Sequence, residues 1–383
     1  MKMTLVKTNF NRRSFLKVSA ATGGGMMIGF NLFTACSPAK QQEIASAPEE
    51  WFNLNAFIKI GDNGAVTIFS PNPEIGQNVK TAMPMIVAEE LDVAWENVTV
   101  EQAGFDIQKY RRQLAGGSQS IRQGWESLRM AGATARRMLM ESAAKEWNVS
   151  ASELTTSEGI ITHEKTGKTM NYGEASAAAV NVSVPDEVEI KDPKDFKIIG
   201  TSKKNVDGKK IVTGERLFGL DVKKEGMLIA GIVHPPAFGM KLKNLDASKA
   251  KSMPGIRDVI TVNCSPEEKQ WSDINAFPDL IAIVGNTTWE VFEAKKALNI
   301  EWESDTPAEN SADHEGALTK ALNGKADEVA RVDGDPDGTF KKADKVIERT
   351  YSAPFLAHNT MEPMNFYADV KPDKVELVGP IQT

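Results

Sequence analysis

Short β-prone runs separated by turn residues open the chain after residue 50. The runs Phe57–Ile60 and Ala65–Phe69 flank Gly61-Asp62-Asn63-Gly64, and this pattern predicts a β-hairpin. Val98–Val100 has the composition of a further strand. We therefore expect a small β layer at the start of the folded chain.

The apolar spacing then changes to that of helices. A helix is predicted over Lys80–Leu91, in which Pro84 is tolerated only in the first turn. A longer helix is predicted from Trp125 to Trp147, where apolar residues recur at helical spacing, namely at Leu128, Ala131, Ala135 and Met138.

A new pattern begins after residues 183–208, which are rich in Pro, Asp and Lys, lack periodicity and predict a domain boundary. A helix is expected over Thr288–Leu298, and residues 315–323 carry a weaker helical signal. A final strand pair is predicted to begin at Lys345 and to end with Val375–Val378. Four short apolar strands precede these elements, at Leu228–Val233, Arg257–Val262, Leu280–Val284 and Leu298–Trp302. This alternation predicts an α+β domain.

The first 36 residues have the order of an export signal. The basic residues there include Arg12 and Arg13, and a weakly apolar run at 18–33 is too short to span a bilayer. The segment Asn11–Lys17 resembles the twin-arginine (Tat) motif, which predicts a periplasmic protein; a basic amphipathic helix is the alternative. Leu32–Cys36 is similar to a lipoprotein cleavage box that would attach lipid at Cys36. Because Phe33 is a poor residue for such a box, cleavage without lipidation stays open.

Composition excludes several classes of protein. The 383 residues are 41% hydrophobic and 25% charged, which is typical of globular domains and not of disordered chains. The net charge of −7 becomes −12 without the five positive charges of residues 1–35, so no nucleic-acid partner is expected. The two cysteines, Cys36 and Cys264, are too few for a disulfide framework, a four-cysteine zinc site or an iron–sulfur cluster.

Few motifs with site chemistry are present. The sequence contains no P-loop and no Gly-x-Gly-x-x-Gly fingerprint, and its four histidines are isolated. The acidic run Asp333–Asp344 resembles a calcium loop, but Pro336 and the missing final Glu favour a loop that starts a helix. Gly116-Gly117-Ser118-Gln119-Ser120 offers free backbone amides before a helix, which can hold a phosphate; a plain turn is the alternative.

Three segments together resemble the xanthine dehydrogenase and aldehyde oxidase family. Residues 205–300 are similar to its α/β hammerhead domain, through Asp207–Gly214 and Met253–Val259. Residues 346–383 resemble the start of its molybdenum-binding region, most clearly at Tyr351–Asn365. Residues 50–200 are similar to the extra N-terminal part found in the isoquinoline 1-oxidoreductase branch, in its β-subunit.

The resemblance implies a fold and a domain order. We expect an α+β chain in which an α/β hammerhead domain is flanked by incomplete molybdopterin-binding α+β domains and preceded by a signal segment. The expected divisions are a signal at 1–36, a linker at 37–50, a molybdopterin-binding-like domain at 51–200, the hammerhead at 201–310, a linker at 311–344 and a truncated molybdenum-binding domain at 345–383.

The resemblance also implies an activity. Members hydroxylate N-heteroaromatic compounds or aldehydes with oxygen from water, using molybdenum held by molybdopterin cytosine dinucleotide. With so few cysteines, a [2Fe–2S] cluster is expected in a separate small subunit, followed by an electron acceptor such as a cytochrome. The family's catalytic Glu would lie beyond Thr383, so the chain is interpreted as the N-terminal part of a large subunit. The alternative is an exported, non-catalytic binding or scaffold lipoprotein on the same fold.

Only cofactor-binding residues carry over to this chain, and no catalytic residue or metal ligand does. Gln382 matches the Gln that approaches the apical oxo ligand of molybdenum. Asn78 replaces the second Gly of the family's Gly-Gln-Gly loop, and a structural turn is preferred for His358 and Glu362. The other cofactor-binding positions are Gln77, Gly116, Gly117, Ser118 and Ser120.

Overall fold

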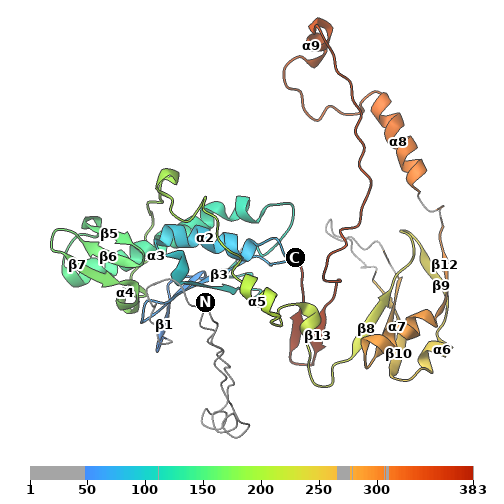
Figure 1. The fold of residues 1–383 in the computed structure, drawn as a ribbon, viewed down its shortest axis with the longest axis horizontal. Coiled ribbons are helices and arrows are strands. Elements are labelled where there is room, and N and C mark those ends of the chain that lie inside the picture. Colours follow the sequence, from blue (N-terminus) through green and yellow to red (C-terminus); the bar gives the residue numbers. More distant parts are fainter. Residues whose placement is uncertain are drawn as a thin grey trace, which may run out of the picture. The chain divides into compact units, whose positions relative to one another are not determined.

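The computed structural model describes residues 48–110, 112–264, 277, 279–305, 307 and 310–382. Helices and several small sheets alternate along the chain, as an α+β prediction requires (Figure 1). The residues divide into two compact units. Of the described residues, those within 48–69, 84–101 and 125–201 form the first unit, and those within 70–83, 102–124 and 202–382 form the second. The predicted signal residues Arg12, Arg13 and Cys36 lie outside the described residues.

A four-stranded sheet opens the described chain, with strands in the order β1-β2-β3-β4. The β2–β3 pair is the predicted hairpin, and its inward residues Ile58, Ile60 and Ile68 are fully buried. The strands are β1 (Trp51–Asn53), β2 (Ile58–Gly61), β3 (Val66–Ser70) and β4 (Val98–Gln102), with the short 3-10 helix η1 (Trp95–Asn97) before β4.

Two helices supply much of the apolar core. The first, α2, is Val79–Leu91, and the second, α3, is Ser120–Trp147. Pro84 lies inside α2 rather than in its first turn, so that expectation was wrong: the helix begins at Val79 and tolerates one missing N–H donor. Helix α3 begins at Ser120, five residues before the predicted Trp125. The prediction missed this first turn because its residues, apart from Ile121, are polar and show no apolar spacing.

A second small sheet in the first unit was not predicted from the sequence. Its strands have the order β5-β6-β7 and are joined by tight turns at Gly159 and Gly167, both with positive φ. Asn171 then caps α4 (Tyr172–Ala179) by accepting a hydrogen bond from the amide of Glu174. The elements are η2 (Ala151–Glu153), β5 (Leu154–Ser157), β6 (Ile160–His163), β7 (Lys168–Asn171) and, after α4, η3 (Pro193–Asp195).

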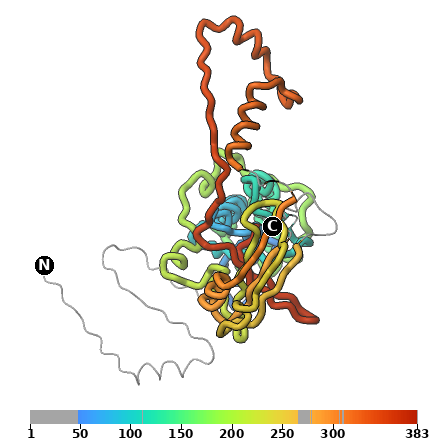
Figure 2. The backbone as a smooth tube through the Cα atoms, turned by 90° about the vertical axis from the view of Figure 1, so that its right-hand side faces the viewer, coloured from blue at the N-terminus to red at the C-terminus, as the bar shows by residue number. Residues whose placement is uncertain are grey.

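The second unit contains the four predicted strands of residues 228–302 together with β9 (Lys241–Asp246), which was not predicted. One sheet has the order β10-β11-β8 and the other pairs β12 with β9; in Figure 2 these strands run as yellow and orange segments. Val259, Ile281, Ile283, Val291 and Ala294 form the centre of its core. The elements are α5 (Gly208–Thr213), η4 (Gly219–Asp221), β8 (Ile229–Val233), α6 (Ser248–Lys251), β10 (Ile256–Asn263), β11 (Asp279–Gly285), α7 (Thr288–Lys296) and β12 (Asn299–Glu303).

The last part of the second unit carries α8 (Ser311–Asn323), α9 (Pro336–Lys342) and the hairpin β13 (Tyr367–Val370)–β14 (Val375–Val378). The final strand pair therefore begins at Tyr367, and the predicted start at Lys345 was wrong, because residues 345–366 have no partner strand among the described residues. Asp335 caps α9 through the amide of Gly338, which confirms the predicted loop and helix start.

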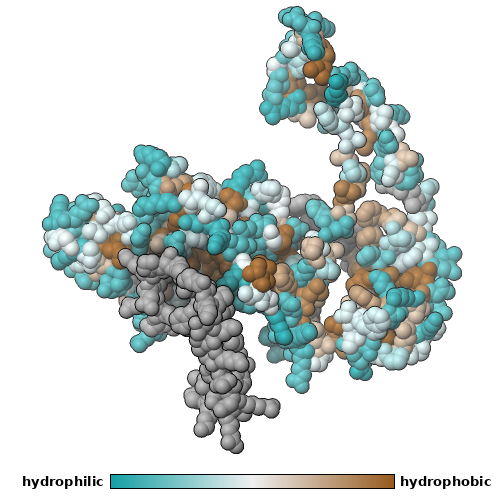
Figure 3. All heavy atoms as spheres, in the orientation of Figure 1, coloured by the Kyte–Doolittle hydropathy of each residue, from teal (hydrophilic) through white to brown (hydrophobic). Residues whose placement is uncertain are grey.

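Within the described residues, no helix has the length and apolar composition that crossing a membrane would require. Exposed hydrophobic side chains form separate patches, which are brown in Figure 3.

Candidate functional site

The turn that precedes α3 is held against the end of the described chain within the second unit. The amide of Ala115 donates to the carbonyl oxygen of Gln382 at 2.7 Å, and the Gln382 side-chain Nε2 donates to the Ala115 carbonyl at 2.8 Å. This pair of bonds joins positions 267 residues apart. The structure therefore brings together Gln382 and the Gly116–Ser120 turn, which sequence reasoning had singled out separately.

Asn72 fixes the same turn from a second side. Its Nδ2 donates to the Leu114 carbonyl and to the Ser120 hydroxyl oxygen, both at 2.9 Å. The Ser120 hydroxyl in turn donates to the Leu114 carbonyl at 3.4 Å. Ser120 thus supports the turn from inside, and Asn72, which is buried, is a site residue that the sequence analysis missed. Its position just after the end of β3 is the one signal in the sequence that could have revealed it.

The backbone of the turn is shaped to expose donors. Gly117 and Ser118 have φ angles of 60° and 54°, and the Gln119 amide closes the turn on the Gly116 carbonyl at 3.2 Å. The amides of Gly116, Gly117 and Ser118 donate to no acceptor in the described part of the chain. Free amides at the positive end of a long helix favour an anionic group such as a phosphate.

A positive side chain lies beside this turn. Arg112 donates from Nη1 to the Gln119 side-chain oxygen at 2.7 Å, and Gln123 donates to the same oxygen. The guanidinium is exposed, so its remaining donors face solvent near the turn. An anion at the free amides would therefore also meet a cation.

Gln77, another predicted cofactor-binding residue, forms side-chain hydrogen bonds within its own loop, and its contact with a cofactor stays a prediction. Its Oε1 accepts a hydrogen bond from the Ile75 amide at 2.7 Å, and its Nε2 donates to the Pro73 carbonyl at 3.0 Å. No hydrogen bond in the described structure joins Gln77 to the 116–120 turn. The side chain of Gln77 therefore shapes its own loop.

Glu74 occupies the N-terminus of α2. Its carboxylate accepts hydrogen bonds from the amides of Gly76, Asn78 and Lys80, at 2.8, 3.0 and 2.9 Å. Because a carboxylate already sits on these amides, a phosphate could bind there only by displacing it. The loop before α3 leaves three successive amides open in the described structure, whereas Glu74 occupies three amides at the start of α2.

Asn78 adopts a left-handed backbone conformation, the region that favours glycine. Its φ is 66°, and its Oδ1 accepts a hydrogen bond from the Thr81 hydroxyl at 2.7 Å. Asn tolerates the left-handed region better than most residues. An Asn at this position can therefore hold a backbone conformation that glycine would also allow, although it adds a side chain.

Two further contacts tie the start of α2 to residues 206 and 207 within the second unit. Lys80 and Asp207 form a half-buried ion pair at 2.6 Å, and the Val206 amide donates to the Thr81 hydroxyl at 3.1 Å. Glu362 accepts hydrogen bonds from the Leu220 amide and from Asn365, which supports the structural turn preferred for it.

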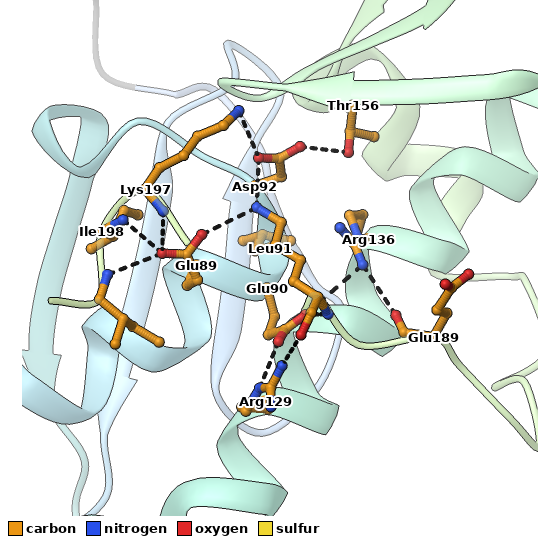
Figure 4. Close-up of polar contacts among 12 residues, drawn as sticks. Glu89, Glu90, Leu91, Asp92, Arg129, Arg136, Thr156, Glu189, Lys197 and Ile198 are labelled. Carbon is orange, nitrogen blue, oxygen red and sulfur yellow. Dashed lines mark hydrogen bonds and ion pairs between the residues drawn. The ribbon is translucent and has the colours of Figure 1, made fainter. Parts of the chain in front are cut away.

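A buried cluster of charges in the first unit was missed by sequence reasoning (Figure 4). Glu89 is 1% exposed, and its Oε2 accepts hydrogen bonds from three successive amides, those of residues 197–199, at 2.6–3.0 Å. Glu90 is fully buried and pairs with Arg129 at 2.7 Å, while Asp92 pairs with Lys191 at 2.8 Å. Two adjacent acidic residues on an apolar helix are the signal that could have revealed it.

This cluster has the character of a clasp and not of a reaction site. Every acidic group in it is paired, and the bonds run from α2 to the irregular segment 189–199. The Arg129 guanidinium also lies over the rings of Trp125 and Phe196, 5.4 and 5.2 Å from their centroids. Among the described residues, no group of three His, Cys, Asp or Glu is placed to hold a metal ion.

Comparison with known proteins gives a family match over the first half of the chain. The model of the molybdopterin cofactor-binding domain family matches residues 10–214, a span that includes the 116–120 turn.

Individual relatives extend this likeness. The beta subunit of isoquinoline 1-oxidoreductase from Brevundimonas diminuta is 28% identical over 66% of this chain and 35% of its own length. A membrane-bound aldehyde dehydrogenase [pyrroloquinoline-quinone] of Gluconacetobacter polyoxogenes is 25% identical over 97% of this chain and 48% of its own length. A nicotinate dehydrogenase subunit of Pseudomonas putida is 24% identical over 85% of this chain and 26% of its own length. The chain thus spans about a quarter to a half of the length of these relatives.

Among solved structures, quinoline 2-oxidoreductase from Pseudomonas putida 86 is 19% identical and overlaps 31% of this chain and 17% of its own, with a TM-score of 0.22. That overlap is too small to support an argument.

Proposed function

The chain belongs to the molybdopterin cofactor-binding domain family of xanthine dehydrogenase and aldehyde oxidase large subunits, and we propose that it forms part of the molybdopterin-binding subunit of a molybdenum hydroxylase. The single observation that carries the proposal is the turn at residues 116–120, where three free amides at the N-terminus of α3 lie beside the Ala115–Gln382 contact. That arrangement suits the phosphates of a dinucleotide cofactor.

The residues present fit the cofactor at this turn. The amides of Gly116, Gly117 and Ser118 would hold a phosphate group, and Arg112 would balance its charge. Gln382 would present its side-chain oxygen, since its Nε2 is already committed to the Ala115 carbonyl. When bound, a molybdopterin cofactor supplies the redox and oxygen-transfer chemistry. The part of this chain is to bind and orient the cofactor.

We extend the proposal to molybdopterin cytosine dinucleotide as the cofactor and to N-heteroaromatic compounds or aldehydes as substrates, oxidised with oxygen from water. A separate [2Fe–2S] subunit is proposed as the first electron acceptor, because the two cysteines of this chain cannot ligate a cluster. We assign no catalytic residue to this chain, which spans less than half of its relatives.

The test is to express the full-length gene with the gene of its small subunit and to purify the complex. We expect molybdenum and cytidine monophosphate in stoichiometric amounts, together with oxidation of an N-heteroaromatic compound or an aldehyde. An active complex without molybdenum would refute the proposal. A folded, stable protein with neither cofactor nor activity would favour the alternative, an exported non-catalytic binding or scaffold lipoprotein.

We also propose that the protein is exported to the periplasm through the twin-arginine motif and carries lipid on Cys36. The paired substitution Arg12→Lys/Arg13→Lys keeps the charge but should leave the protein in the cytoplasm. Cys36→Ser should leave export intact and release the protein from the membrane fraction. Periplasmic accumulation of the paired Lys variant would contradict the export route.

A further inference from the structure

One buried side-chain nitrogen joins the two ends of the turn that carries the open amides. The Nδ2 atom of Asn72 donates to the Leu114 carbonyl and to the Ser120 hydroxyl oxygen, both at 2.9 Å. Leu114 and Ser120 lie on either side of the segment 115–119, which contains those amides. Because the same nitrogen contacts both residues, it fixes the separation between the ends of this segment.

The backbone that carries Asn72 is itself held by two other side-chain amides. Gln102 donates from Nε2 to the carbonyls of Ser70 and Asn72, at 2.9 and 3.0 Å. Gln113 donates from Nε2 to the Pro71 carbonyl at 3.0 Å. Three successive carbonyl oxygens, from the last residue of β3 onward, are therefore paired with side chains. Such support keeps the Asn72 side chain in one orientation.

Asn72 acts on the turn from beneath its surface. The residue is only 4% exposed, whereas Gly117 and Ser118 are exposed. Its influence on a ligand at the open amides therefore passes through the turn. A turn whose ends are already fixed loses less conformational freedom when a ligand binds, and the ligand is then held more tightly.

We propose that Asn72 is a positioning residue for the cofactor site. It holds residues 115–119 in the conformation that leaves the amides of Gly116, Gly117 and Ser118 open to a phosphate. The inference rests on the proposed function, because it names the residue that shapes the same site.

Cofactor retention in the full-length complex, purified with its small subunit, tests the inference. Asn72→Leu keeps a branched side chain but removes both hydrogen bonds, so we expect molybdenum and cytidine monophosphate to be lost roughly ten-fold faster during dialysis. The matched control is Asn55→Leu. Asn55 also donates from Nδ2 to α3, but to the Ala131 carbonyl at 3.0 Å, further along the helix, so its loss should leave the rate unchanged.

The outcomes separate this inference from the proposed function. A wild-type complex that contains neither molybdenum nor cytidine monophosphate would refute the proposed function, and the inference with it. A loaded wild-type complex with wild-type retention in Asn72→Leu would overturn the inference alone. Equal acceleration in Asn72→Leu and Asn55→Leu would also overturn it.

A spectroscopic readout separates positioning from a general loss of stability. Phosphorus NMR of the loaded complexes reports the surroundings of the cofactor's phosphates. We expect the resonance to move toward that of the free cofactor in Asn72→Leu and to keep its wild-type position in Asn55→Leu. If Asn72→Leu fails to fold, Ser120→Ala removes one of the two contacts and should shift the resonance in the same direction by less. An unchanged resonance in the folded variant would overturn the inference.

Discussion

Tyr172 shows how one buried side chain links α2 to the start of α4. Its ring is buried, and its hydroxyl donates to the Leu91 carbonyl at 2.7 Å. Burial, and to a lesser degree the charge of Asp92, raise the pKa of this phenol far above its ordinary value of 10.0. The folded state therefore favours the neutral, protonated form of the Tyr172 phenol.

The raised pKa of Tyr172 gives a pH dependence with a definite sign. The stability that the neutral phenol contributes is complete below the unfolded-state pKa near 10 and is lost as the pH rises above it. Tyr172→Phe should cost about 1 kcal/mol at neutral pH for the lost hydrogen bond. It should also remove up to about 1.4 kcal/mol per pH unit from the fall of the free energy of unfolding at alkaline pH. Urea unfolding between pH 8 and 11 measures both; an unchanged alkaline slope would contradict this assignment.

For single residues, the sequence predicts where turns form better than it predicts the contacts of side chains. The Gly-Gly-Ser turn was predicted because glycine pairs and hydroxyl residues favour such turns. Gln77 was expected to face the cofactor, and its pairing with Pro73 and Ile75 could not be foreseen, since it depends on the side-chain rotamer. Asn72 was missed because its partners are 42 and 48 residues away.

Helices α2 and α3 approach closely at Gly132. A Cβ on Gly132 would overlap the Val87 carbonyl oxygen and lie 2.8 Å from the Cβ of Glu90. A glycine inside a 28-residue helix is otherwise unfavourable, so this contact explains its presence.

Replacing this glycine tests the packing. Gly132→Ala should destabilise the protein by about 1–3 kcal/mol, because the overlap outweighs the gain in helix propensity. Gly316 lies within α8 with nothing within 4 Å of an added Cβ, so Gly316→Ala should stabilise by up to about 1 kcal/mol. Thermal unfolding of both variants gives the comparison; a stabilising Gly132→Ala would show that the helices are not in contact there.

The charge clasp gives a second prediction for these elements. Glu89→Ala removes the acceptor of three amides and should cost about 3–5 kcal/mol while exposing residues 189–199 to proteases. Glu141→Ala breaks only a partly exposed helical pair with Arg137 and should cost less than about 0.5 kcal/mol. Limited proteolysis and denaturant unfolding measure both effects. Equal costs would mean that the clasp stabilises the fold no more than a surface ion pair does.

The elements found from sequence are those with strong periodicity. The core of α3 and the strands of residues 228–302 combine length with apolar spacing, so their pattern survives without tertiary context. Strands β5–β7 were missed because each has four residues and little alternation, as in Lys168–Asn171. Their pairing is fixed by turns at Gly159 and Gly167, not by apolar periodicity.

At the scale of the whole molecule, family membership was predictable because several motifs occur in order along the chain. The family match over residues 10–214 confirms the resemblance, and the relatives are two to four times longer than the part that this chain covers. The meeting of Ala115 and Gln382 was not predictable, because no local pattern reports a contact across 267 residues. The predicted domain limits, export and lipidation stay predictions.

We propose above all that the turn at residues 116–118 holds the phosphates of a molybdopterin cofactor. A matched pair of glycine variants of the full-length complex tests it. Gly117 has a φ of 60° at the turn, and Gly167 has a φ of 69° in the β6–β7 turn with nothing within 4 Å, so valine strains both backbones alike.

The measurement is the molybdenum and cytidine monophosphate released from each purified complex. We expect Gly117→Val to lose most of both, while Gly167→Val keeps them. Full cofactor content in Gly117→Val, with the fold intact, would contradict it.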